Sequence, residues 1–198
     1  AATRALQALG ATASTPPLAA RSDQRPTAPD RRPTTNDHPG WTAYLLPPRP
    51  ADADPASGSA IPVQSVRASQ HPEDVRRMFD GDVGTAWGSG VSQIGGEEVV
   101  LDLGLPHDVS MLVLEMGSYA FGHANALEVS VSVDDVNWAP VFDGPLGVRA
   151  VRAAVQRPET VPITIPLTPA SARFVRLRQV GAEPGIPWWI AEIGVRGR

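Results

Sequence analysis

From Ile61 to the end of the chain, short β-branched runs alternate with Gly, Pro, Asp and Asn at intervals of roughly ten residues. The odd-numbered positions are apolar in residues 98–103 and again in residues 127–133, so each run presents one apolar face to a shared core. We therefore expect an all-β fold, an antiparallel β-sandwich, with no competing helical period. The expected strands are residues 63–68, 98–103, 109–116, 126–133, 141–142, 148–155, 161–167, 173–180 and 190–196.

Residues 1–60 have a different character and hold ten of the 21 prolines. A proline-rich polar segment has little to bury and is expected to act as a linker. Two pieces stand out, a short helix at residues 1–9 and an alternating strand at residues 41–46. We interpret residues 1–60 as a linker or as the trailing edge of a preceding domain, and residues 61–198 as one β-sandwich domain.

Composition excludes several classes of function. The formal net charge of -4 disfavours nucleic acid as a partner, because no continuous positive field is available to neutralise phosphates. Cysteine is absent, which excludes disulfides and thiolate metal sites. No apolar run is long enough to span a membrane, and the alanine-rich start lacks the order of a secretory signal. All 17 basic residues are arginine, a bias that indicates a GC-rich bacterial genome.

Four blocks of the sequence occur in an order that is similar to a known family. Residues 78–87 read M-F-D-G-D-V-G-T-A-W, residues 98–104 read E-V-V-L-D-L-G, and residues 129–138 read V-S-V-S-V-D-D-V-N-W. The fourth block is a strand pair, A-R-F-V-R-L at 172–177 and W-W-I-A-E-I at 188–193. Together they resemble the coagulation factor 5/8 type C, or discoidin, family, which includes the family 32 carbohydrate-binding modules. The resemblance covers residues 61–198 and implies a discoidin-type jelly roll.

The resemblance implies a structural calcium ion that joins an early loop to the last strand. Calcium prefers six to eight oxygen ligands, and a tight loop with carboxylate and hydroxyl groups can supply several. The alternative is that the loop is only a turn and that Glu192 is an exposed strand residue. Trp87 and Trp188 are expected to fill the core near this site. The implied ligands are carboxylate oxygens of Asp80 and Glu192, main-chain oxygens of Arg77, Asp82 and Ala191, and both oxygens of Thr85.

Loops are where a sandwich places its ligand contacts, because its strands form the core. Aromatic rings beside His and Asn groups suit the apolar faces and hydroxyl groups of sugars. The richest such loop is residues 117–125, and a second is residues 181–189. A third loop is residues 88–96, and a polar turn at residues 70–76 lies near it. For each, the alternative is an ordinary packed or solvated loop. The candidate ligand-binding residues are Tyr119, Phe121, His123, Asn125, Trp189, Glu183, His71 and Arg76.

Catalysis is not expected. The four histidines lack metal-ligand spacing, no nucleophile elbow is present, and adjacent acid pairs diverge instead of facing one bond. We expect a non-catalytic carbohydrate-binding module with a glycan as partner. It would be an appendage of a larger extracytoplasmic or membrane-anchored glycan-processing protein, and so could also contact that protein's other domains. The alternatives are a protein-adhesion or lipid-binding discoidin module, and a structural spacer.

Overall fold

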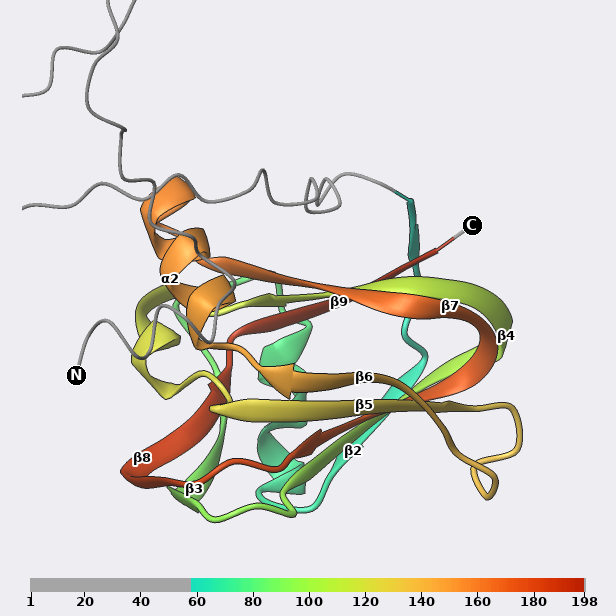
Figure 1. Ribbon diagram of the computed structural model, residues 1–198, viewed down its shortest axis with the longest axis horizontal. Helices are drawn as coiled ribbons and strands as arrows, with labels where there is room; N and C mark the ends of the chain where they lie inside the picture. Colours follow the sequence, from blue (N-terminus) through green and yellow to red (C-terminus); the bar gives the residue numbers. More distant parts are fainter. Residues whose placement is uncertain (1–57, 198) are drawn as a thin grey trace, which may run out of the picture. The chain divides into compact units, whose positions relative to one another are not determined.

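The computed structural model describes residues 58–197, most of which lie in strands (Figure 1). The predictions for residues 1–9 and 41–46 lie outside the described residues. Within the described part, no helix has the length and apolar character needed to cross a membrane. The elements are β1 (Ser59–Ile61), β2 (Ser65–Ala68), η1 (Pro72–Met78), β3 (Trp87–Gln93), β4 (Glu98–Glu115), η2 (Gly117–Gly122), β5 (Ala126–Ser132), β6 (Ala139–Pro145), α2 (Gly147–Gln156), β7 (Pro162–Gln179), β8 (Glu183–Ile190) and β9 (Glu192–Gly197).

The strands form one large antiparallel sheet and one small one. The large sheet has the order β1-β9-β4-β7-β5-β6, with β2 also paired to β4, and β3 pairs with β8 separately. Strands β4 and β7 each have 18 residues and pair with each other, with a break in register between Asp102 and His107. Figure 1 shows both strands curving at one end of the domain, so that the large sheet returns over itself. The predicted antiparallel β-sandwich is confirmed.

The core lies between these layers and follows the predicted alternation. Val99 and Leu101 of β4, and Val175 and Leu177 of β7, are completely buried and belong to one hydrophobic cluster. Cross-strand pairing brings Val99 opposite Leu177 and Leu101 opposite Val175, which is why both strands present the same face inward. Burying each such side chain contributes about 1.5–3 kcal/mol relative to exposure.

The outer face of the same strands carries charged side chains. Arg173 donates two hydrogen bonds to Asp102, from Nε to Oδ1 at 2.8 Å and from Nη2 to Oδ2 at 2.9 Å. This bidentate pair, with the N–H of Gly104, holds the pKa of Asp102 below its usual value. The guanidinium of Arg176 lies over the Trp138 ring at 4.5 Å from its centroid. These contacts fasten β7 to β4 and to the hairpin that joins β5 to β6.

The prediction of a strand at residues 148–155 was wrong, because this segment is the helix α2. Its inward face is made of small residues, with Ala150 and Ala153 each 5% exposed and packed in the core cluster. The valines that suggested a strand lie on the opposite side, 65% to 80% exposed. The β-branched composition was therefore misleading, and the spacing of the alanines was the correct signal.

Three smaller predictions also need correction. Residues 88–96 and 181–189 were expected to be loops, but most of them belong to the paired strands β3 and β8. Strand β3 contains two glycines, and β8 contains one glycine and two prolines, which mask the strand pattern. Val133 was expected to face the core, yet it lies beyond the end of β5 and is 55% exposed. Asp135 follows it in the hairpin turn with φ of 62°, the left-handed conformation for which glycine is usual.

Candidate functional site

The loop after η1 folds around its own acidic side chains. Asp80 accepts hydrogen bonds at both carboxylate oxygens, from the Asp82 N–H at 2.9 Å and from the Thr85 hydroxyl at 2.7 Å. The Thr85 hydroxyl also lies 3.2 Å from the main-chain oxygen of Asp82, whose carboxylate accepts the Gly84 N–H at 2.8 Å. Gly81 provides the tight turn with φ of 79°. The hydroxyl and N–H donors hold the pKa of Asp80 below its usual value.

Glu192 closes this loop from the far end of the sequence. It opens β9, and its Oε1 accepts the Gly81 N–H at 2.7 Å across 111 residues of chain. Its carboxyl group also contacts that of Asp80. Burial raises the pKa of Glu192, and the neighbouring Asp80 carboxyl group adds to this effect. The loop and the last strand are thus joined by two acidic groups in contact.

The donor set of this site fits a hard cation. Two carboxylates, a hydroxyl and a main-chain oxygen converge, and all are the oxygen ligands that calcium prefers. Two carboxyl groups in contact repel each other when both are ionised, and a cation between them would remove that repulsion. The other two predicted ligand residues adjoin the site, because Arg77 is the last residue but one of η1, shortly before the loop, and Ala191 directly precedes Glu192.

The two tryptophans predicted to be core residues are completely buried beside this loop. Trp87 and Trp188 meet edge to face, with ring centroids 5.3 Å apart. Trp87 donates its ring N–H to the main-chain oxygen of Gln70 at 2.9 Å. Trp188 donates its backbone N–H to the Ser89 hydroxyl at 3.0 Å. The acidic loop is therefore followed in the chain by a buried layer in which β3 and β8 pack together.

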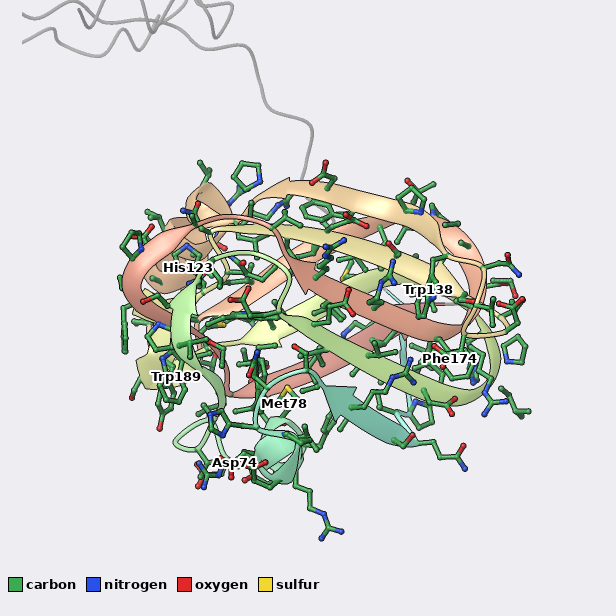
Figure 2. All side chains as sticks on the ribbon, turned by 90° about the horizontal axis from the view of Figure 1, so that it is seen from below. Asp74, Met78, His123, Trp138, Phe174 and Trp189 are labelled. Carbon is green, nitrogen blue, oxygen red and sulfur yellow. The ribbon has the colours of Figure 1, made fainter. Side chains whose placement is uncertain are left out.

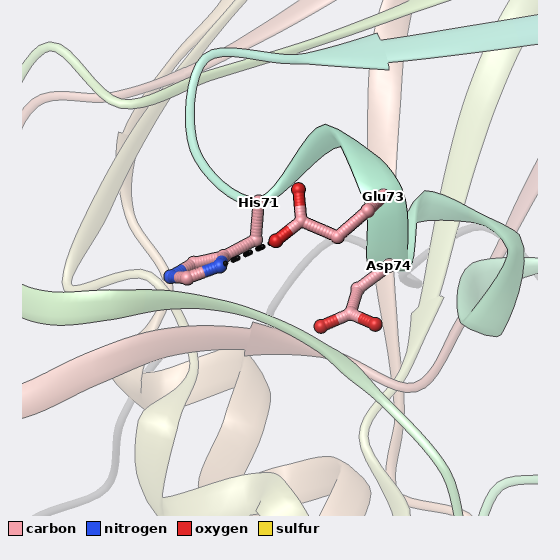
Figure 3. Close-up of side chains that lie close together, drawn as sticks. All are labelled: His71, Glu73 and Asp74. Carbon is pink, nitrogen blue, oxygen red and sulfur yellow. Dashed lines mark hydrogen bonds and ion pairs between the residues drawn. The ribbon is translucent and has the colours of Figure 1, made fainter.

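A second acidic group lies at the start of η1 (Figure 3), and the sequence analysis missed it. The possible ligand atoms of His71, Glu73 and Asp74 lie within 4.8 Å of one another. His71 Nδ1 is 3.0 Å from a Glu73 oxygen, and Asp74 pairs with Arg77 at 3.2 Å. The signal was the contiguous segment H-P-E-D, which a helical turn brings together. His71 and Glu73 are exposed and Asp74 is half-buried, and because each already has a protein partner, none needs a metal to be satisfied.

Tyr119 and Trp189 form a stacked pair of rings, here called the ring platform. Their centroids are 5.1 Å apart and their planes are inclined by 29°. Trp189 is half-buried and fixed by close glycines, since a Cβ on Gly88 would lie 2.6 Å from its ring and one on Gly122 would lie 2.2 Å away. The Tyr119 hydroxyl donates to the main-chain oxygen of Gly84 at 3.1 Å. The platform is therefore bonded directly to the acidic loop.

Next to the ring platform lies a group of loop residues, Phe121, His123, Asn125 and Glu183, here called the loop cluster. Phe121 is 62% exposed, and η2 contacts β8, the strand that begins at Glu183. The Asn125 side-chain amide donates to Glu183 Oε2 at 3.2 Å, which joins the second predicted loop to the first. Figure 2 shows His123 and Trp189 at one end of the domain, with Trp138 and Phe174 at the other.

Two buried glutamines support the loop cluster. Gln93 was expected only as an ordinary polar residue of the third loop, and Gln179 was not considered. Gln93 of β3 accepts the Asn125 N–H at 2.9 Å and donates to the His123 main-chain oxygen at 3.1 Å. Gln179 of β7 donates to Gln93 at 2.8 Å. Both are almost completely buried, although residues 88–96 were expected to be surface. That these amides are buried next to a candidate loop can be seen only once the pairing of the strands is known.

The remaining two candidates, His71 and Arg76, belong to a different part of the surface. The His71 ring lies over Gly90, where a Cβ would be 2.4 Å from Nε2. Among the contacts described for residues 58–197, none joins His71 or Arg76 to the loop cluster. The structure therefore brings Tyr119 to Trp189 and Asn125 to Glu183, and leaves the η1 residues outside this arrangement.

Comparison with known proteins agrees with this architecture. The sequence matches the profile of the F5/8 type C domain over residues 60–193, and a search of curated proteins finds no match. Among solved structures, the chain is similar to the CBM32 of AlyQ in complex with 4,5-unsaturated mannuronic acid, with 19% identity, a TM-score of 0.54, and coverage of 69% of this chain and 97% of that one.

Two further structures have the same fold. One is CpGH89CBM32-5 from Clostridium perfringens in complex with GalNAc-β-1,3-galactose, with 18% identity, a TM-score of 0.54, and coverage of 70% and 100% of the two chains. The other is chitosan-binding module 1 derived from a chitosanase/glucanase of Paenibacillus sp. IK-5, with 21% identity, a TM-score of 0.52, and coverage of 67% and 94%. The fold and the profile match together show that this chain belongs to the F5/8 type C, or discoidin, domain family.

Proposed function

We propose that residues 58–197 form a carbohydrate-binding module that carries out no reaction of its own. The observation that carries this proposal is the loop cluster, where the 62% exposed ring of Phe121 is combined with groups that can hydrogen-bond. An exposed ring can stack on the apolar face of a sugar, and the polar groups can bond its hydroxyls. Similar folds that bind a mannuronic acid, GalNAc-β-1,3-galactose and chitosan support the same conclusion.

The ring platform has a supporting role in this proposal. One face of the Tyr119 ring is covered by Trp189, and its hydroxyl is bonded to Gly84. Trp189 is held between Gly88 and Gly122. Both rings therefore fix the position of η2 and β8, and Phe121 offers a sugar a freer aromatic surface. A spacer domain with closed loops would not need an exposed phenylalanine at this position.

We propose that calcium occupies the acidic loop as a structural ion. Asp80, Thr85 and Glu192 would hold it through oxygen atoms, with main-chain oxygens of Arg77, Asp82 and Ala191 completing the set. The contact between the Asp80 and Glu192 carboxyl groups supports this assignment. A bound ion would neutralise both groups and fasten β9 to the loop, and so stabilise the domain without a disulfide.

A wider role follows from this proposal. One similar module comes from a chitosanase/glucanase, where it accompanies an enzyme. By analogy, this module would hold a larger glycan-processing protein near its substrate outside the cytoplasm. Its partners would then be a polysaccharide and the other domains of that protein.

The test is a binding screen of the full chain, loaded with calcium, against soluble and insoluble polysaccharides. Phe121→Ala is expected to weaken saturable binding by at least about tenfold, because the exposed ring is lost. The matched control is Val136→Ala, which removes apolar surface from a residue that is 75% exposed in the β5–β6 hairpin. Absence of binding across a broad panel, or equal loss in both variants, would contradict the proposal.

A further inference from the structure

The polar groups of the loop cluster differ in whether they are already used within the protein. Asn125 donates both bonds of its side-chain amide, to the Ala182 main-chain oxygen at 3.0 Å and to Glu183 Oε2 at 3.2 Å. Its backbone N–H is bonded to Gln93 at 2.9 Å. Among the contacts described for residues 58–197, no donor reaches the amide oxygen of Asn125, and an amide oxygen can only accept a hydrogen bond.

His123 shows the same arrangement. Its Nδ1 lies 2.9 Å from the main-chain oxygen of Ala120, and because a carbonyl oxygen can only accept, Nδ1 must carry the hydrogen. In the neutral ring this leaves Nε2 as an acceptor. The backbone N–H of His123 is also bonded to Ala120, at 3.4 Å. Both donors of His123 are thus used within its own loop. Among the contacts of residues 58–197, Nε2 has no hydrogen-bond partner and is an acceptor in the neutral ring.

Glu183 supplies the third free group and the charge. One oxygen accepts the Asn125 amide, and the other has no protein donor among the contacts of residues 58–197. Within the same residues Glu183 forms no ion pair with any arginine or histidine. Among the described residues, the carboxylate is therefore a negative charge without an ion-pair partner, bonded to Asn125.

We infer that the loop cluster selects its glycan by charge, an inference that rests on the proposed carbohydrate-binding function. The free atoms are the Asn125 amide oxygen, His123 Nε2 and one Glu183 oxygen, and all three accept hydrogen bonds. They match hydroxyl and ammonium groups, which donate. A uronate or sulfate would bring a second negative charge to Glu183 and would find no donor in the cluster. The site thus binds amino sugars most tightly, neutral sugars less tightly and acidic sugars weakest.

The experiment is isothermal titration calorimetry of the full, calcium-loaded chain with tetramers of chitosan, chitin and galacturonate at low salt and pH 7, where an ordinary imidazole is mostly neutral. Chitosan is expected to bind about tenfold more tightly than the galacturonate, with chitin between them. In Glu183→Gln, which keeps an oxygen acceptor for Asn125, this preference is expected to fall to about threefold or less. Added salt should reduce the wild-type preference, because the interaction is partly exposed.

Glu159→Gln is the matched control, since it removes one exposed carboxylate outside the cluster. It is expected to keep the wild-type order. Tighter or equal binding of the galacturonate by the wild type would overturn the charge inference while leaving the module a carbohydrate binder. An unchanged preference in Glu183→Gln would overturn it as well. If the wild type binds none of these tetramers or any other glycan in the polysaccharide screen, both the inference and the proposed function fail.

Discussion

Gly122 is the position where one added methyl group should do the most damage to the ring platform. A Cβ built there lies 2.2 Å from Trp189 Cδ1 and 2.7 Å from the main-chain oxygen of Pro187. Carbon atoms pack at about 3.5–4.0 Å, so the Trp189 ring must move by more than about 1 Å. It cannot rotate freely, because the Gly88 backbone lies against another part of the ring, where a Cβ would be 2.6 Å away, and Tyr119 covers one face.

We expect Gly122→Ala to destabilise the domain by about 2 kcal/mol, within the usual range for an overpacked site. For a domain of this size this corresponds to a Tm lower by roughly 6 °C. Urea unfolding followed by tryptophan fluorescence measures the change, and near-UV circular dichroism reports the displaced ring. Glycan affinity should fall as well, because the displaced Trp189 ring keeps η2 and β8 from packing closely against each other.

Gly147→Ala is the matched control for this substitution. A Cβ at Gly147 meets no atom within 4 Å, and the residue opens the helix α2. Alanine favours a helix over glycine, so this variant should be as stable as the wild type or slightly more stable. The steric argument would be refuted if Gly122→Ala unfolded within about 0.5 kcal/mol of the wild type and kept its near-UV spectrum.

Three further predictions concern the acidic loop and the outer face. Calcium at about a hundred times its Kd should stabilise the wild type by about 2.7 kcal/mol, measured by thermal unfolding with calcium or with EGTA. Asp80→Asn should lose most of this gain. An equal gain in the variant and the wild type would contradict the proposed site. Tyr119→Phe keeps the ring stack but removes the hydrogen bond to Gly84, so the free energy of unfolding in urea should fall by about 1 kcal/mol. An unchanged free energy of unfolding would argue against that bond. Asp102 has a lowered folded pKa, so its pairing with Arg173 stabilises the fold above about pH 4 and is lost as the pH falls below that value. Asp102→Asn should therefore be less stable by about 1 kcal/mol at pH 6, and the difference should shrink as the pH falls below about 4. A difference independent of pH would refute this reasoning.

The regular parts of the fold were predictable because their residues follow a simple rule. Strands β4, β5 and β7 alternate apolar and polar residues, and one buried face is enough to fix their register. The helix α2 was missed because it buries alanines, whose small side chains give a weak apolar signal beside exposed valines. Strand β3 was missed because Gly88, which makes room for the Trp189 ring, interrupts its pattern, and β8 was missed because its prolines and Gly185 do the same.

Some residues of the candidate site were likewise predictable from the sequence, and others were not. Asp80, Thr85 and Glu192 could be named from short motifs, because their grouping depends on a tight loop and one neighbouring strand. Gln93 and Gln179 could not, since an amide is indistinguishable from a surface residue until the strands around it are paired. The charge character of the loop cluster was equally hidden, because it depends on which donors the protein has already used.

The pairing of β1 with β9 determines how the domain responds to mechanical load. Ser59 lies opposite Gly197, so the two ends of the described domain are neighbours in one antiparallel pair. A force applied through both ends pulls these strands apart from one side, and loads their hydrogen bonds one after another instead of all together. Only three residue pairs resist before β1 is detached. When the domain is stretched between two anchors, it should therefore yield first at this edge, while the long strands β4 and β7 remain paired.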